Sequence, residues 1–227
     1  MRTFILLLVF IFILPLNAQR SDFKEIDFWR ADYIAEQYEG EDLYNLPLLV
    51  HGLTSQLKTE VEQFRAIYYW VCYNIRGDYY LMSQNDRFYS KFKNDPESLQ
   101  QWNRKFKKEV FSKLLKDQET LCTGYAYLIK ELANLAGLDC EIIYGYGPLN
   151  KMKISKGLAP NHSWNAVKLD GRWYLCDATW SSGFIDMATF MFEFKYEDSY
   201  FLMEPEVFLK SHEPVEEKWR LLKPQSN

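Results

Sequence analysis

The sequence lacks the signatures of several common kinds of protein. It has no internal repeat and no low-complexity linker. Histidine is scarce, with three residues: His51, His162 and His212. The four cysteines include no Cys-x-x-Cys pair, so a zinc site of the usual kind is poorly supported. There is also no EF-hand-like loop for calcium. We therefore expect no metal, and the sequence does not imply an organic cofactor.

Strong charge of one sign is also lacking, because the formal net charge is −4 over 227 residues. Such mild acidity gives no electrostatic reason to expect a nucleic-acid partner. Beyond the N-terminus no stretch is long and apolar enough to cross a membrane. What the sequence does have is aromatic side chains, at 17% of residues, which supply large surfaces for the core of one ordinary domain.

The N-terminus has the three parts of a secretory signal peptide. Arg2 precedes an unbroken apolar run over residues 4–14, and the small residue Ala18 stands before polar Gln19. The run is shorter than the roughly 20 residues that a membrane-spanning helix needs, although an uncleaved anchor is the alternative. We expect residues 1–18 to be removed, which would leave a periplasmic or extracellular protein without stable membrane insertion.

Residues 19–54 are expected to form a helical lead-in to the main domain, which we place at residues 55–223. That domain opens on a capping box, in which Thr59 is the N-cap and Glu62 the N3 residue. A helix should follow, because apolar residues recur on one side of it. They are Val61, Phe64, Ile67 or Tyr68, Val71 and Ile75. Cys72 lies inside this helix, where a buried thiol is the simplest interpretation.

Residues 80–118 are polar and irregular, and we interpret them as a segment inserted into the domain. The segment is rich in basic residues: Arg87, Lys91, Lys93, Arg104, Lys105, Lys107 and Lys108. They form either a basic patch for an anionic partner or the solvated face of a helix. Acidic residues at positions 97, 109 and 117 dilute the positive charge and favour the second interpretation.

A second helix is predicted over residues 122–136, because small and large apolar residues cover a wide face of it. Gly137 is a natural residue to end this helix, and Cys122 stands at its N-terminal end. The positive end of the helix dipole and its free N–H groups favour a thiolate there and can hold an oxyanion. Gly124 permits another chain to approach closely. Cys122 is thus the best candidate nucleophile, and a buried structural cysteine is the alternative.

Residues 161–180, NHSWNAVKLDGRWYLCDATW, predict a β-hairpin around the Asp170–Gly171 turn. Such a turn pairs Leu169 with Arg172, and it would therefore pair Trp164 with Asp177. Because faces repeat every second residue, His162 should lie on the same face as these two residues. Cys176 falls on the opposite face.

An imidazole and a carboxylate on one face of the hairpin are two parts of a catalytic triad. The carboxylate of Asp177 would hold the His162 ring in one tautomer and stabilise its cation. A lone histidine on a strand, such as His162, is more often a structural or surface residue. A lone aspartate at a strand end, such as Asp177, is usually a turn residue. Together with a thiol at a helix start, however, they match what acyl transfer needs: a nucleophile, a base and an orienting acid.

Three blocks of the sequence resemble the transglutaminase-like superfamily of papain-type Cys-His-Asp proteins. They are FRAIYYWVCYNIRGD (64–78), LCTGYAYLIKELANLAGLDCEIIYGYG (121–147) and NHSWNAVKLDGRWYLCDATW (161–180). The tail at residues 200–222 is similar to the branch that includes the kyphoscoliosis peptidase and the cytokinesis-type transglutaminase-like proteins. The resemblance implies that Cys122 is the nucleophile, His162 the general base and Asp177 its orienting acid.

The expected fold is α+β and papain/transglutaminase-like, with a central helix that begins at the cysteine and packs on an antiparallel sheet. The resemblance implies a thioester at Cys122, resolved by water in a peptidase or amidase or by an amine in a transglutaminase. A peptide or protein is the expected partner, and the oligomeric state stays open. The alternative is a non-catalytic scaffold that binds a peptide or glycan.

Three residues are further predicted to shape a substrate cleft: Trp164, Trp180 and Gly124. The side-chain partner of the oxyanion hole is left open among Trp102, Gln118 and Trp180. His212 is interpreted as structural, and His51 has no evident partner.

Overall fold

The computed structural model describes residues 20–92, 94–148 and 159–222 of the chain. The expected signal peptide at residues 1–18 lies outside these ranges. The helices are α1 (Trp29–Glu36), α2 (Leu46–Thr54), α3 (Glu60–Asn74), α4 (Tyr79–Phe92), α5 (Pro96–Asp117), α6 (Cys122–Leu135), α7 (Ala178–Ser182) and α8 (Pro205–Phe208), with 3-10 turns η1 (Arg20–Phe23), η2 (Asp198–Tyr200) and η3 (Glu217–Arg220). The strands are β1 (Arg76–Gly77), β2 (Glu119–Thr120), β3 (Cys140–Tyr146), β4 (His162–Leu169), β5 (Arg172–Cys176), β6 (Gly183–Asp186), β7 (Met191–Phe194) and β8 (Glu213–Pro214). The mixture confirms the predicted α+β class.

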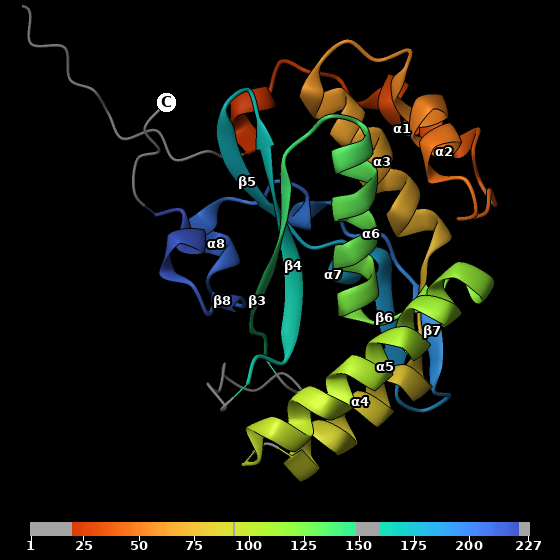
Figure 1. Cartoon of the computed structure of the whole chain (residues 1–227). Coiled ribbons are helices and arrows are strands. Elements are labelled where there is room, and N and C mark those ends of the chain that lie inside the picture. The colour runs from red at the N-terminus through yellow and green to blue at the C-terminus, as the bar shows by residue number, and fades with distance from the viewer. Residues whose placement is uncertain (1–19, 93, 149–158, 223–227) are drawn as a thin grey trace, which may run out of the picture.

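An antiparallel sheet of order β5-β4-β3-β8 forms the centre of the fold (Figure 1). Leu169 pairs with Arg172 across the Asp170–Gly171 turn, so the predicted register is confirmed there. The ladder ends at Asn165 and Cys176, one step before the predicted pair of Trp164 with Asp177. Asp177 instead leaves the strand and becomes the N-cap of α7.

Helix α6 packs on one face of this sheet, and α3 packs against α6 in the same core, as Figure 1 shows. The predicted capping box begins α3, because Thr59 and Glu62 satisfy each other's backbone N–H groups. α6 buries Ile129, Leu132 and Ala133 against the sheet and α3. Burial of these apolar surfaces is the main force that fixes α6, and with it the cysteine at its first position.

The C-terminal segment covers the opposite face of the sheet. Phe208, Trp219 and Leu221 pack there against Trp164 and Leu175 to form a second cluster of buried side chains. The tail thus lies over the end of the sheet at which β4 begins, and it brings His212 toward the same place. Within the described ranges no helix combines the length and the apolar character that crossing a bilayer requires.

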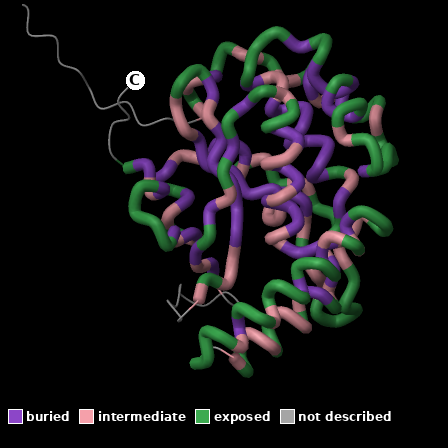
Figure 2. The backbone as a smooth tube through the Cα atoms, viewed as in Figure 1, coloured by how far each residue is buried: buried purple, intermediate pink, exposed green. Residues whose placement is uncertain are grey.

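The segment at residues 80–118 is not irregular, and that prediction is wrong. α4 and α5 form an antiparallel helical pair beside the N-terminal end of α6 (Figure 1). Asp95 caps α5 and Pro96 occupies its first turn, both strong signals for a helix start. In Figure 2 most of the pair is exposed or intermediate. Its few buried side chains, including Leu81 and Phe106, pack beside Leu121.

The lead-in at residues 19–54 packs into the same core as the rest of the domain. α1 lies on α3, and the buried Arg65 of α3 joins Asp32 of α1 to Asp198 of η2. The Nε atom of Arg65 lies 2.6 Å from Asp32 Oδ1, and its Nη1 atom contacts Asp198 Oδ1. Because the two parts share one core, the packing marks no boundary between lead-in and domain, and the boundary at residues 54 and 55 stays a prediction.

We expect Arg65→Ala to lower the free energy of unfolding by about 3 kcal/mol, because it leaves two partly buried carboxylates without their shared cation. Urea titration followed by circular dichroism measures this change. Lys218→Ala is the matched control, since the Lys218–Glu216 pair is exposed and should contribute less than about 1 kcal/mol. Equal losses in the two variants would contradict this account of the core.

Candidate active site

Cys122 is the first residue of α6, as the sequence predicts, and its side chain is half-buried. The residue before it, Leu121, has extended backbone angles, and among the described residues no side chain caps the helix start. The N–H groups of Gly124 and Tyr125 donate to the carbonyl oxygen of Leu121, so those of Cys122 and Thr123 are the ones left at this helix start for a developing negative charge.

The missing side chain of Gly124 leaves space for Thr120, which precedes the helix, and not for a ligand. A Cβ atom at Gly124 would lie 1.8 Å from Thr120 Oγ1 and 2.8 Å from Thr120 Cβ, so only glycine fits there. Gly124 is itself buried. The prediction that Gly124 borders a substrate cleft is corrected accordingly: it allows Thr120 to pack directly under the helix start.

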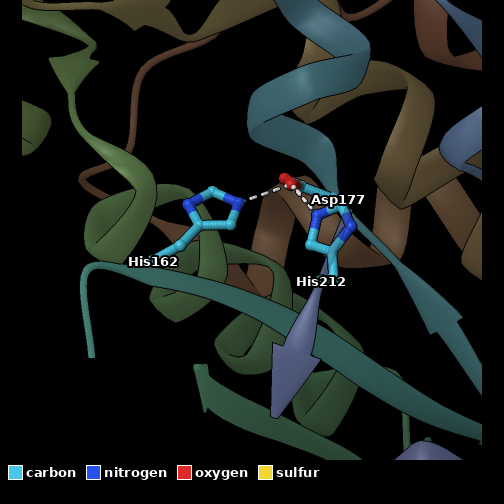
Figure 3. Close-up of side chains that lie close together, drawn as sticks. All are labelled: His162, Asp177 and His212. Carbon is cyan, nitrogen blue, oxygen red and sulfur yellow. Dashed lines mark hydrogen bonds and ion pairs between the residues drawn. The ribbon is translucent and has the colours of Figure 1, made fainter. Parts of the chain in front are cut away.

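His162 and Asp177 meet at the start of β4, as Figure 3 shows. The Nε2 atom of His162 lies 2.7 Å from Asp177 Oδ2. The other carboxylate oxygen, Oδ1, accepts hydrogen bonds from the backbone N–H groups of Thr179 and Trp180 at 2.8 and 3.2 Å. Because Nε2 is engaged by the carboxylate, Nδ1 is the nitrogen left for Cys122.

The thiol and the imidazole shift each other's pKa toward the charged pair. Burial alone would raise the pKa of the Cys122 thiol, but hydrogen bonding and charge from His162, with further hydrogen bonds from Ser163, lower it below the ordinary value. Burial would lower the pKa of His162, yet the charge of Asp177 and interactions with Cys122 raise it. Both directions favour a thiolate beside an imidazolium, the reactive form of a catalytic cysteine.

The other three cysteines lack these features. Cys72, Cys140 and Cys176 are buried, and burial raises the pKa of each thiol. Cys72 lies in the core of α3, as predicted. All four cysteines are free thiols. Cys122 therefore stands apart both in exposure and in the direction of its pKa shift.

A cavity of about 280 Å³ opens beside Cys122 and His162. One wall comes from the α4–α5 pair, and Tyr89 of α4 also hydrogen-bonds the carbonyl oxygen of Ala159 just before β4. The residues that line this cavity are Asn85, Tyr89, Leu99, Asn103, Phe106, Lys107, Val110, Leu121, Cys122, Thr123, Tyr144, Ala159, Pro160, Asn161, His162 and Ser163. The helical pair thus supplies one side of the space in which a substrate would lie.

Neither of the two predicted cleft tryptophans lines this cavity. Trp164 is 1% exposed and lies in the core cluster with Phe208, so its predicted place on the cleft surface is corrected. Trp180 stacks on the His162 ring, with a 5.2 Å separation of the ring centroids. Trp180 therefore covers one face of the imidazole and limits the contact of that face with water.

The structure gives little support to the predicted oxyanion donors. The Nε2 atom of Gln118 donates to the carbonyl oxygen of Glu41 at 2.8 Å, and Trp102 is stacked on Phe88 and Phe106. Trp102, Gln118 and Trp180 are all outside the set of described residues that line the cavity. The backbone N–H groups at the start of α6 are the donors that the fold places nearest Cys122.

His212 is the site residue that the sequence does not reveal. Its Nε2 atom lies 3.0 Å from Asp177 Oδ2, so this one oxygen contacts two imidazoles (Figure 3). His212 lies 35 residues after Asp177, beyond any strand register that the sequence predicts.

The three side chains of His162, Asp177 and His212 also have the composition of a metal site. One donor atom of each lies within 4.8 Å of the others. However, both ring nitrogens are at hydrogen-bonding distance from the same oxygen, and a proton must lie in each gap. A metal ion would have to replace both hydrogen bonds, so this geometry fits a hydrogen-bonded network better.

Comparison with known proteins is consistent with this geometry. The family model of the transglutaminase-like superfamily matches residues 48–178. The chain is 34% identical over 199 residues to the kyphoscoliosis peptidase of Homo sapiens, covering 83% of this chain and 27% of that protein. It is 26% identical over 218 residues to hillarin of Drosophila melanogaster, covering 87% and 23%. The chain thus spans about a quarter of the length of these relatives.

Among solved structures, one described as a crystal structure of a TGase is similar, with a TM-score of 0.38 and 14% sequence identity. The similarity covers 67% of this chain and 32% of that structure.

Proposed function

The chain belongs to the transglutaminase-like superfamily, and we propose that it is an exported cysteine enzyme that transfers acyl groups from peptide amides. One observation carries the proposal. Cys122 is a half-buried thiol with a lowered pKa that shares a cavity with His162, and Asp177 holds the His162 ring. The similarity to a protein named a peptidase supports the same reaction class.

The proposed reaction begins when the Cys122 thiolate attacks the carbonyl carbon of an amide. A C–S bond forms, and backbone N–H groups at the start of α6 stabilise the negative oxygen. When the C–N bond breaks, the His162 imidazolium gives its proton to the leaving amine, and a thioester remains on Cys122. His162 then takes a proton from water or from a second amine, which attacks the thioester and releases the thiolate.

We favour water as the acceptor, so that the enzyme is a peptidase or amidase. The test compares a glutamine-containing peptide alone with the same peptide plus a primary amine, and follows both products by mass spectrometry. Release of ammonia or of a cleaved fragment that exceeds amine incorporation supports hydrolysis. Amine incorporation that exceeds hydrolysis would replace a hydrolase with a transferase. Neither product, together with tight peptide binding, would favour the scaffold.

Export is the second part of the proposal, and the apolar run at residues 4–14 before Ala18 supports it. Full-length protein produced in a secreting host should begin at Gln19 when its N-terminus is sequenced. An intact Met1 on protein that stays with the membrane fraction would favour an anchor.

Lys107 is expected to influence which peptides bind. Among the described residues that line the cavity there is no carboxylate, and Lys107 is the one charged side chain outside the Cys122–His162 pair. A peptide with an acidic residue near the reacting amide should therefore be preferred to one with a basic residue. We expect Lys107→Glu to change this preference by about three- to fivefold in kcat/KM, as is typical of an exposed ion pair.

Paired acidic and basic peptides assayed with the same enzyme measure this preference. Lys105→Glu, on the same helix but outside the lining of the cavity, is the matched control for net charge. A similar change in both variants would show that the overall charge of α5, and not Lys107 in the cavity, selects the peptide.

A further inference from the structure

We propose that His212 is a positioning residue that fixes the Asp177 carboxylate against the His162 ring, which makes the site a Cys-His-Asp-His network. This inference rests on the proposed function, because it concerns how the acid of the triad is held. His212 lies on the tail segment between α8 and β8, remote in sequence from all three triad residues. Figure 3 shows the two rings on either side of the carboxylate.

The surroundings of His212 leave its ring little freedom. The residue is 0% exposed, and its ring stacks on that of Phe208 with a centroid separation of 3.9 Å and an interplanar angle of 23°. Trp180 packs on it as well, at a centroid separation of 4.4 Å. The tail of the chain thus holds the imidazole in one orientation against Asp177.

The contact with Asp177 assigns one proton on this ring. Nε2 lies 3.0 Å from Asp177 Oδ2, and an ionised carboxylate only accepts hydrogen bonds, so Nε2 must carry a proton. Nδ1 lies 2.9 Å from Ser211 Oγ and 3.3 Å from the carbonyl oxygen of Phe208. In the neutral ring Nδ1 accepts from the Ser211 hydroxyl, the nearer of the two groups, and makes no hydrogen bond to the carbonyl oxygen. Burial lowers the pKa of His212, and this supports the neutral form.

The resulting carboxylate is fully occupied. Oδ2 accepts from the Nε2–H groups of His162 and His212, and Oδ1 accepts from the backbone N–H groups of Thr179 and Trp180. Asp177 is 0% exposed, so without these donors its charge would be costly to bury. Burial alone would raise the pKa of Asp177, but the charge and hydrogen bond of His162, together with the hydrogen bond of His212, hold it far below its usual range.

The consequence for reactivity follows from geometry. If His212 no longer donates to Oδ2, that oxygen has a vacant acceptor site in an apolar surrounding, and the carboxylate is held on this side by His162 alone. The His162 ring then loses its fixed partner, and its Nδ1 atom is less well aligned with Cys122. A small misplacement of a catalytic group commonly costs about a hundredfold in rate.

The experiment compares His212→Leu, which keeps apolar bulk and removes the donor, with His212→Gln, whose side-chain amide can donate in place of Nε2. The readout is the rate at which iodoacetamide alkylates Cys122 near neutral pH, followed by peptide mass spectrometry. We expect the Leu variant to react about tenfold or more slowly than wild type and the Gln variant to stay within about threefold of wild type. The thermal midpoint of each variant is measured alongside.

Each outcome decides between the hypotheses. Rescue by Gln but not by Leu supports a positioning role, whereas a merely structural role would not distinguish the two by donor capacity. A Leu variant that reacts at the wild-type rate, or Leu and Gln variants that are equally slow, would overturn the inference alone. A wild-type Cys122 that reacts no faster than Cys72 would instead overturn the proposed function.

A second measurement serves if the Leu variant does not fold. Nitrogen NMR of wild-type protein should show His212 protonated on Nε2 and not titrating from about pH 5 to about pH 8. A proton on Nδ1, or a metal ion that co-purifies in stoichiometric amount and is lost in the Gln variant, would overturn the inference.

Discussion

Replacement of Cys122 by serine is expected to lower the rate of acyl transfer by roughly 10⁴-fold or more, with peptide binding nearly unchanged. Serine is close to cysteine in size, so α6 should still begin at this position and keep the N–H groups of its first turn. A serine hydroxyl, however, is not ionised by the surroundings that lower the pKa of the thiol. The proposed site therefore depends on sulfur and not merely on a nucleophile of the right size.

The measurement is a single-turnover assay on a peptide amide, with product followed by mass spectrometry. Cys72→Ser is the matched control, because Cys72 is buried in α3 and its pKa is raised by burial. That variant should keep the wild-type rate per folded molecule, although its stability is expected to fall. Retained activity in Cys122→Ser would assign the chemistry to another group and reject Cys122 as the nucleophile.

Asp177→Asn is expected to lower the rate by about 10³- to 10⁴-fold while the fold is kept. Asparagine is as good an N-cap as aspartate, so α7 should still begin at this position. If its carbonyl oxygen keeps the two backbone N–H groups, its amide nitrogen faces His162 in place of Oδ2. An amide donor there requires an unprotonated Nε2 on both rings that contact Oδ2 in the wild type, and in His162 this moves the ring proton to Nδ1, the side of Cys122.

The His162 ring of this variant can no longer accept a proton from the thiol. Loss of the negative charge should also lower the pKa of His162 and raise that of Cys122, the reverse of the wild-type directions. Asp186→Asn is the control, since Asp186 caps an exposed turn. An unchanged rate in Asp177→Asn would show that orientation of the ring by this acid has no part in the reaction.

The sequence contains the local information that positions His162 and Asp177. The Asp170–Gly171 turn fixes the pairing of Leu169 with Arg172, and the period of two along β4 puts His162 on the face of Trp164. Asp177 lies one residue beyond the ladder, and its place is set by its role as the N-cap of α7. Likewise the apolar face of α6 and the position of Cys122 at its start follow from helical periodicity alone. The catalytic roles of these residues remain predictions until activity is measured.

Other features depend on packing that periodicity does not describe. The α4–α5 pair could have been recognised from the sequence, because Leu99, Phe106, Val110 and Leu114 recur at helical spacing along α5. The many charged residues between them obscure this stripe. Asp95 and Pro96 add the signals of a helix start. The place of Trp164 in the core followed from the C-terminal segment that covers it.

His212 illustrates the limit most clearly. Its contact with Asp177 arises because the tail crosses the sheet face and brings Phe208 and Trp219 onto Trp164. The sequence shows neither the length of that crossing nor the face on which it ends. A polar residue in an apolar tail is a weak signal, but two imidazoles that share one buried acid become evident once the chain is folded.

The most direct test of the account is the pH dependence of alkylation at each cysteine of the wild-type protein. The thiolate fraction rises as the pH passes the pKa, so a lowered pKa places the half-maximal rate of Cys122 below the ordinary value of 9.0. We predict this result for Cys122, with no measurable labelling of Cys72, Cys140 or Cys176 in the same range, and loss of the low-pH reactivity in His162→Ala. A half-maximal rate of Cys122 at or above the ordinary value, unchanged in His162→Ala, would contradict the central claim that this thiol is activated.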